Sequence, residues 1–267
     1  HLLYNPFQFG VLTLIESTGL KPDILSLTMA VNAICAMTIL FITGKILLWL
    51  DSGKPLAIAG VVFAGSCFSL MRYATENEAY LFPLLFGLAG SLSYIKFRIT
   101  GKNLHVLLSG LGVSLSVLFH QIGLFWWLGI FIWILSTPPR KKALALYLVP
   151  GLLIPLFYIL AWKTEGAQTT AGNLIEFALY SYSTGDANVS LSFNAILLGV
   201  INLARSFLQV HGNILFFPRE NLLYLLPAAG FAAGLLVAFL QRKKRFVRKE
   251  EPSRGIAAVH LLVASAL

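Results

Sequence analysis

Long apolar runs alternate with short polar breaks along most of the chain. The complete runs occupy residues 24–50, 55–70, 81–97, 104–119, 122–135, 143–162 and 222–240, and an eighth run, 256–267, is incomplete. A helix needs roughly 20 residues to cross about 30 Å of hydrocarbon. A transmembrane barrel would show alternating segments of about 10 residues, a pattern absent here. We therefore predict an all-α polytopic transmembrane bundle, with about seven complete spans and a partial eighth.

Two stretches of this pattern need an interpretation of their own. Residues 193–210 carry polar side chains between apolar ones at helical spacing, which predicts an amphipathic helix lying in the membrane interface. A single helix over 104–135 would be about 48 Å long, well beyond the hydrocarbon core. We therefore predict a tight hairpin whose tip is His120 and Gln121.

Composition agrees with a membrane protein. The 267 residues are 57% hydrophobic and 12% charged, with a mean hydropathy of +0.79, which excludes a water-soluble domain. The net charge of +9 lies in short clusters between apolar runs, where membrane topology is a commoner cause than nucleic-acid binding. Cys35 and Cys67 lie inside apolar runs and read as packing residues. We predict one transmembrane domain over residues 1–267 and no nucleic-acid partner.

The charged residues divide between the two sides of this predicted bundle. Fifteen Lys and Arg residues fall on one side and five on the other, so the positive-inside rule makes the first side cytoplasmic. Eight of the eleven carboxylates fall on the opposite, external side. That side also has the longest polar segments, including a predicted loop over 163–221 that contains the interfacial helix. Any chemistry is therefore expected on the external face.

A polar break at residues 71–80 carries the strongest local signal. If it is helical, Arg72, Glu76 and Tyr80 share one face, and Glu78 points roughly the other way. One interpretation is a solvated helix start with an Arg72–Glu76 ion pair. The other is that one carboxylate acts as a general base or orients a sugar hydroxyl while Arg72 binds a lipid phosphate.

The hairpin tip is a second candidate on the same face. His120 and Gln121 precede two tryptophans, Trp126 and Trp127, that suit the membrane interface. A histidine at a hairpin tip commonly satisfies backbone groups, and this structural role is one interpretation. The alternative is that His120 joins a site shared with Glu76 or Glu78.

Three outward segments occur in a distinctive order: His1-Leu2-Leu3-Tyr4-Asn5, the Arg72–Tyr80 break and Leu118-Phe119-His120-Gln121. Together they resemble the GT-C superfamily of multi-span glycosyltransferases, in the layout of protein O-mannosyltransferases and lipid A aminoarabinose transferases. The resemblance covers most of residues 1–135. It implies transfer of a sugar from a polyprenyl-phosphate donor, in the inner (plasma) membrane of a bacterium, with the active face extracytoplasmic.

The same resemblance suggests residue roles and one departure. Glu78 and Tyr80 are the positions carried over first, with Glu76 as a further catalytic candidate and Arg72, His120 and Gln121 as substrate-binding candidates. The superfamily's principal carboxylate lies in the first outer loop, and this chain has no acidic residue before Glu16. Because the chain starts at His1 without a Met and stops within an apolar run, we expect a fragment that lacks that carboxylate.

Other functions remain open at this level. A transporter or flippase of lipid-linked or small polar substrates needs discontinuous helices and polar residues near the bilayer midplane. A non-catalytic scaffold would not need polar groups gathered on one face. The sequence names no certain cofactor, leaves dependence on a divalent metal undecided, and does not specify the sugar or the acceptor, which is a protein, a lipid or a glycan.

Overall fold

The structure is a computed structural model. It describes residues 2–50, 53–138, 140–165 and 173–179 and a few single positions beyond residue 197. Every regular element in these ranges is a helix, which confirms the predicted all-α class. The helices are α1 (Tyr4–Glu16), α2 (Ile24–Trp49), α3 (Lys54–Gly65), α4 (Phe68–Thr75), α5 (Leu81–Thr100), α6 (Asn103–Phe119), α7 (Gly123–Ser136), α8 (Arg140–Gly151), α9 (Leu153–Glu165) and α10 (Leu174–Ala178).

The helices follow the apolar runs closely, but the number of spans is not confirmed. Two helical stretches are long and apolar enough to cross a membrane: α2, and residues 141–164, which include most of α8 and α9. Helices α3 and α4 meet at a 59° bend and count as a third if they form one broken span. Helices α6 and α7 are apolar but shorter. The predicted seventh run, the incomplete eighth and most of the predicted interfacial helix lie outside the described residues.

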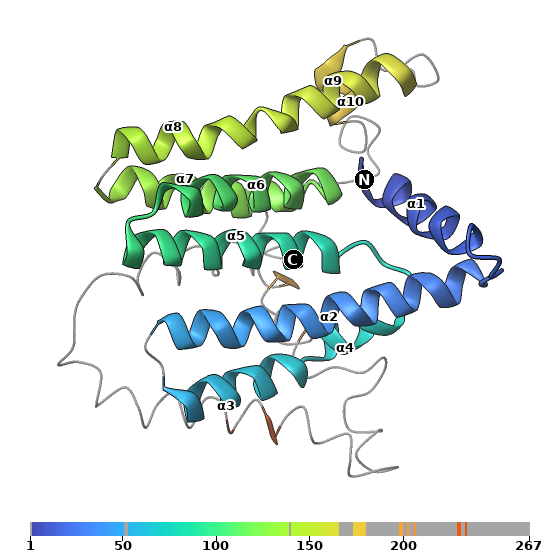
Figure 1. Ribbon diagram of the computed structural model, residues 1–267, viewed down its shortest axis with the longest axis horizontal. Coiled ribbons are helices and arrows are strands. Elements are labelled where there is room, and N and C mark those ends of the chain that lie inside the picture. The colour runs from blue at the N-terminus through green and yellow to red at the C-terminus, as the bar shows by residue number, and fades with distance from the viewer. Residues whose placement is uncertain are drawn as a thin grey trace.

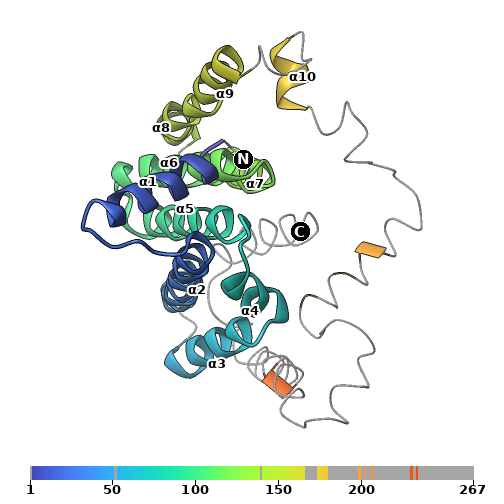
Figure 2. The ribbon, with the colours of Figure 1, turned by 90° about the vertical axis from the view of Figure 1, so that its right-hand side faces the viewer.

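The long helices are stacked side by side with their axes roughly parallel. Helix α5 packs between α2 and α6, and α6 also contacts α7 and α8 (Figures 1 and 2). Helix α6 ends at Phe119 and α7 begins at Gly123, which confirms the predicted break at His120 and Gln121. Large apolar side chains remain exposed on the outside of the stack, among them Phe41, Ile58 and Leu152. Such a surface suits lipid rather than water.

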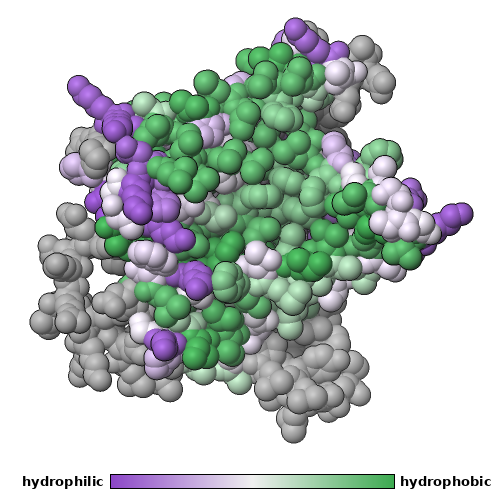
Figure 3. Space-filling view, in the orientation of Figure 1, coloured by the Kyte–Doolittle hydropathy of each residue, from purple (hydrophilic) through white to green (hydrophobic). Residues whose placement is uncertain are grey.

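Polar residues gather at the two ends of the stack. An apolar band covers the middle of the visible face, and hydrophilic residues lie to either side of it (Figure 3). The α2–α3, α5–α6 and α7–α8 connections share one end, and the α4–α5 and α6–α7 connections share the other (Figure 1). At the first end, the Lys96 ammonium of α5 lies 5.8 Å from the ring centroid of Trp49 in α2. The basic residues up to Lys142 are therefore divided between the two ends of the stack as predicted. The basic cluster at 242–254 lies outside the described residues.

Glycines allow the two central helices to approach closely. A Cβ added to Gly112 of α6 would lie 2.9 Å from the backbone nitrogen of Gly90 in α5, and one added to Gly90 would lie 3.0 Å from the Ser109 carbonyl oxygen. Backbone atoms cannot move aside as a flexible side chain can. Small residues are the usual means of such close contact between membrane helices.

We expect Gly112→Ala to destabilise the bundle by about 1–3 kcal/mol, because the added methyl group forces α5 and α6 apart. Gly10→Ala is the matched control, since a Cβ at Gly10 has no neighbour within 4 Å and alanine favours a helix. Thermal unfolding of the purified protein in detergent measures both. Equal unfolding temperatures for the two variants would mean that the crossing is not close-packed.

Candidate functional site

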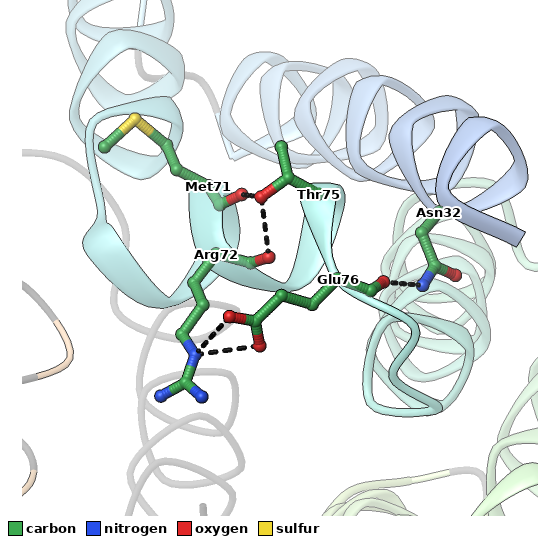
Figure 4. Close-up of polar contacts among 5 residues, drawn as sticks. All are labelled: Asn32, Met71, Arg72, Thr75 and Glu76. Carbon is green, nitrogen blue, oxygen red and sulfur yellow. Dashed lines mark hydrogen bonds and ion pairs between the residues drawn. The ribbon is translucent and has the colours of Figure 1, made fainter. Parts of the chain in front are cut away.

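The polar break begins as a helix and continues as a loop. Helix α4 ends at Thr75, whose hydroxyl donates to the carbonyl oxygens of Met71 and Arg72 over 3.2 and 3.1 Å (Figure 4). Glu76 is extended, with φ −111° and ψ 162°. The break is therefore a helix end and not the helix start that the sequence suggested. The helical register that would place Arg72, Glu76 and Tyr80 on one face stops before Tyr80.

The predicted ion pair between Arg72 and Glu76 is present. The Arg72 Nε donates to both carboxylate oxygens of Glu76, over 3.0 and 2.9 Å (Figure 4). The two side chains are 36% and 40% exposed. Solvent screens a pair at this exposure, so it contributes little to stability. The pair occupies the Glu76 carboxylate and leaves the terminal nitrogens of Arg72 pointing away from Glu76.

A buried amide holds the loop that follows. Asn32, in the first half of α2, is fully buried. Its Nδ2 donates to the backbone oxygen of Glu76 over 2.7 Å (Figure 4) and to the backbone oxygen of Glu78 over 3.0 Å. Asn32 was not among the site residues predicted from the sequence. The available signal was an amide inside the apolar run 24–50, where an unpaired polar side chain is costly and therefore marks a specific contact.

The N-terminal segment packs against the same loop. The Tyr4 hydroxyl of α1 donates to Asn77 Oδ1 over 3.0 Å, and the Leu3 backbone N–H donates to the Leu118 carbonyl over 3.1 Å. The Tyr4 ring also meets Phe82 edge to face, with centroids 5.6 Å apart. Burial raises the pKa of the Tyr4 hydroxyl, the nearby amides of Gln8 and Asn32 oppose this shift, and the charge of Glu78 adds to it.

Stacked aromatic rings connect the loop to the hairpin tip. Tyr80 lies between Tyr73 and His120, with centroid distances of 5.1 and 5.0 Å. The His120 Nδ1 accepts a hydrogen bond from the Ile122 backbone N–H over 3.1 Å, and burial lowers the pKa of the imidazole. The ring is therefore neutral at pH 7, with its proton on Nε2.

Gln121 makes a different contact. Its Nε2 donates to the Ala178 carbonyl oxygen of α10 over 2.7 Å. This bond joins the hairpin tip to a short helix of the predicted external loop, 163–221. The predicted role of Gln121 in substrate binding stays a prediction. Most of that loop lies outside the described residues.

Glu78 differs from Glu76 in what its carboxylate contacts. Asn32 binds the Glu78 backbone oxygen, and the half-buried carboxylate has no hydrogen bond or ion pair with any residue that the structure describes. Its charge nonetheless acts on Tyr4 and on Arg72. Of the two glutamates predicted as catalytic, Glu78 is thus the one available to a substrate.

The predicted site residues are linked through the loop, although not as one directly contacting set. Arg72 binds Glu76, Tyr80 contacts His120, and the charge of Glu78 acts on Arg72. The described ranges contain no group of three or more His, Cys, Asp or Glu residues placed to hold a metal ion.

Comparison of the chain with protein-family models, with curated proteins and with solved structures gave no match.

Proposed function

We propose that this chain is a GT-C-like glycosyltransferase, which moves a sugar from a polyprenyl-phosphate donor to an acceptor on the extracytoplasmic side of the membrane. The observation that carries the proposal is the Glu78 carboxylate, half-buried and unoccupied by any described residue, at one end of an apolar helical stack. A carboxylate in that position suits removal of a proton from an acceptor hydroxyl at the membrane edge.

The surrounding groups support the remaining requirements of such a transfer. The acceptor oxygen would attack the anomeric carbon, the bond from that carbon to the phosphate oxygen would break, and Glu78 would take the hydroxyl proton. The terminal nitrogens of Arg72 offer a planar pair of donors for the departing polyprenyl phosphate. Tyr80, which lies against the ring of a neutral His120, would provide an aromatic surface for the sugar.

The orientation is part of the proposal. The Lys and Arg residues at the α2–α3, α5–α6 and α7–α8 connections favour a cytoplasmic position for that end of the stack. The loop with Glu78 and the hairpin tip with His120 lie at the opposite end. Both would then face the extracytoplasmic side of the inner membrane, where lipid-linked sugars meet their acceptors in this class of enzyme.

One observation favours the alternative, a transporter or flippase. The 59° bend between α3 and α4 gives the chain a discontinuous apolar helix, which is a common feature of transporter sites. The bend leads into α4 and hence to Arg72, so the two functions share the same polar loop. Chemical cleavage of the donor distinguishes them, because a flippase moves a lipid without breaking it.

The role of Arg72 provides a test within the full-length protein. We expect Arg72→Ala to raise the donor concentration needed for half-maximal transfer about tenfold, since one charged contact to phosphate is lost. Glu76→Gln is the matched control, because it weakens the same ion pair and keeps the cation. Steady-state kinetics with varied donor lipid measure both. An equal rise in the two variants would assign the effect to the ion pair and remove Arg72 from phosphate binding.

A further inference from the structure

A second set of polar groups lies beside Glu78 and is not used in the transfer described above. It comprises the side chains of Tyr4 and Gln8 in α1 and of Asn32 in α2. All three are buried, with exposed fractions of 8%, 8% and 0%. Tyr4 and Gln8 lie about one turn apart on α1, the Tyr4 hydroxyl donates to Asn77, and Asn32 donates to the backbone of residues 76 and 78, so the three side chains lie around one loop. We call these three residues the amide cluster.

The amide cluster has hydrogen-bonding capacity that the described protein does not use. Both amide atoms of Gln8, Nε2 and Oε1, are buried with no hydrogen-bond partner, and so is Oδ1 of Asn32. The Nδ2 of Asn32 is already occupied by the backbone oxygens of Glu76 and Glu78. Buried polar atoms are nearly always paired in native proteins, so unpaired atoms gathered in one place indicate a missing partner.

The chemistry of the unused atoms restricts that partner. They comprise one amide donor group and two amide acceptors, and the carboxylate of Glu78 adds a third acceptor. A phosphate accepts hydrogen bonds and carries negative charge, so it does not suit a set rich in acceptors and without a cation. A hydroxyl both donates and accepts, and several hydroxyls on one ring suit a mixed set of donors and acceptors.

We infer that the amide cluster is a recognition subsite for the hydroxyl groups of a neutral sugar. This inference rests on the proposed function, and it assigns sugar recognition to Gln8 and Asn32 while phosphate binding stays with Arg72. The subsite lies against the loop that carries Glu78, so it orients the sugar ring relative to that residue. Hydrogen bonds to the sugar would also pair the buried amide atoms that have no partner within the protein.

Gln8 offers the sharper test, because it has no hydrogen bond within the described protein that a substitution would break. Gln8→Met keeps the length of the side chain and removes both amide atoms. We expect this variant to unfold at the same or a higher temperature than wild type, since a buried unpaired amide is lost. We expect its binding of the matching sugar to be about tenfold weaker. Asn5→Leu is the matched control, because it removes an exposed amide from the same helix.

Two probes separate this inference from the proposed function. The first is a panel of methyl hexopyranosides and pentopyranosides titrated into the detergent-solubilised full-length protein, and it tests the subsite without any donor lipid. The second compares a polyprenyl-phosphate hexose with polyprenyl phosphate that carries no sugar. A wild-type preference for the sugar-bearing lipid that disappears in Gln8→Met supports both proposals. Methyl glycoside binding that depends on Gln8, without any binding of the donor lipid, supports the subsite and rejects the donor.

The remaining outcomes overturn the inference. If no glycoside binds, or if one binds wild type and Gln8→Met equally, the amide cluster does not recognise sugar. A lower unfolding temperature in Gln8→Met would show that the amide is a structural group, paired with an ordered water. If Gln8→Met binds the sugar-bearing and the sugar-free lipid more weakly by the same factor, Gln8 contacts the phosphate or the polyprenyl chain and not the sugar.

Discussion

Glu78→Gln is expected to lower the rate of sugar transfer by about 10²–10⁴-fold, the range typical of a lost general base. The substitution keeps the shape of the side chain and removes only its charge. The backbone bond from Asn32 to the Glu78 carbonyl oxygen is independent of that charge, so the loop should keep its conformation. Transfer by the full-length protein is measured with saturating donor lipid, and expression and unfolding temperature are recorded beside it.

Glu76→Gln is the control that this prediction requires. It removes the other carboxylate of the same loop, which the structure pairs with Arg72. Because a screened ion pair contributes little, the loss of transfer in this variant should be small compared with that in Glu78→Gln. Wild-type turnover in Glu78→Gln would remove Glu78 from the catalytic site.

Asn32→Leu is expected to have the largest effect on folding, with a loss of stability of about 2–4 kcal/mol. The leucine leaves two backbone oxygens, those of Glu76 and Glu78, without the donor that now binds them. Each part-buried acceptor left unpaired costs about 1–2 kcal/mol, the lower part of the range for a buried group. Transfer should fall as well, because the loop that carries Glu78 loses its anchor to α2.

Asn103→Leu is the matched control for this second prediction, since Asn103 is an exposed asparagine at the start of α6. Thermal unfolding in detergent and the rate of donor consumption are compared for both variants. If Asn32→Leu and Asn103→Leu unfold at the same temperature, the buried amide does not hold the loop, and the position of Glu78 must have another cause.

The helices were predictable because apolar runs of bilayer length leave few alternatives. The stretch 104–135 was too long for one span, so it required a break. The polar pair His120 and Gln121 marked where the turn lies. The number of spans was harder to predict from the apolar runs. Runs of 14 to 17 residues are apolar enough for a membrane but short for it, and α6 and α7 fall in that range.

The details of the site depended on contacts that a linear pattern does not contain. The spacing of Arg72 and Glu76 predicted their ion pair because both lie within one helical turn of each other. Spacing did not predict where α4 ends, so it overextended the helical face to Tyr80. The amides of Gln8 and Asn32 are buried on two different helices, α1 and α2. The only signal in the sequence was that both amides lie among apolar residues, where a polar side chain needs a hydrogen-bond partner.

The structure also separates two carboxylates that the sequence left equivalent. Glu76 and Glu78 are two residues apart, and either was a candidate base. Glu76 is bound by Arg72, whereas no residue in the described ranges binds the Glu78 carboxylate. The difference assigns the proton-accepting role to Glu78 within the proposed function and leaves Glu76 to hold the cation.

The central claim is that the loop at residues 76–80 serves cleavage of a lipid-linked sugar, and following a labelled sugar tests it most directly. The full-length protein is reconstituted in proteoliposomes with a polyprenyl-phosphate hexose labelled in the hexose, and membrane extract is added from outside as the source of acceptor. We predict that label leaves the donor lipid, that free polyprenyl phosphate accumulates, and that Glu78→Gln prevents both. Label that stays on intact lipid, whether or not that lipid crosses the bilayer, would contradict a transferase, and intact lipid that does cross would identify a flippase.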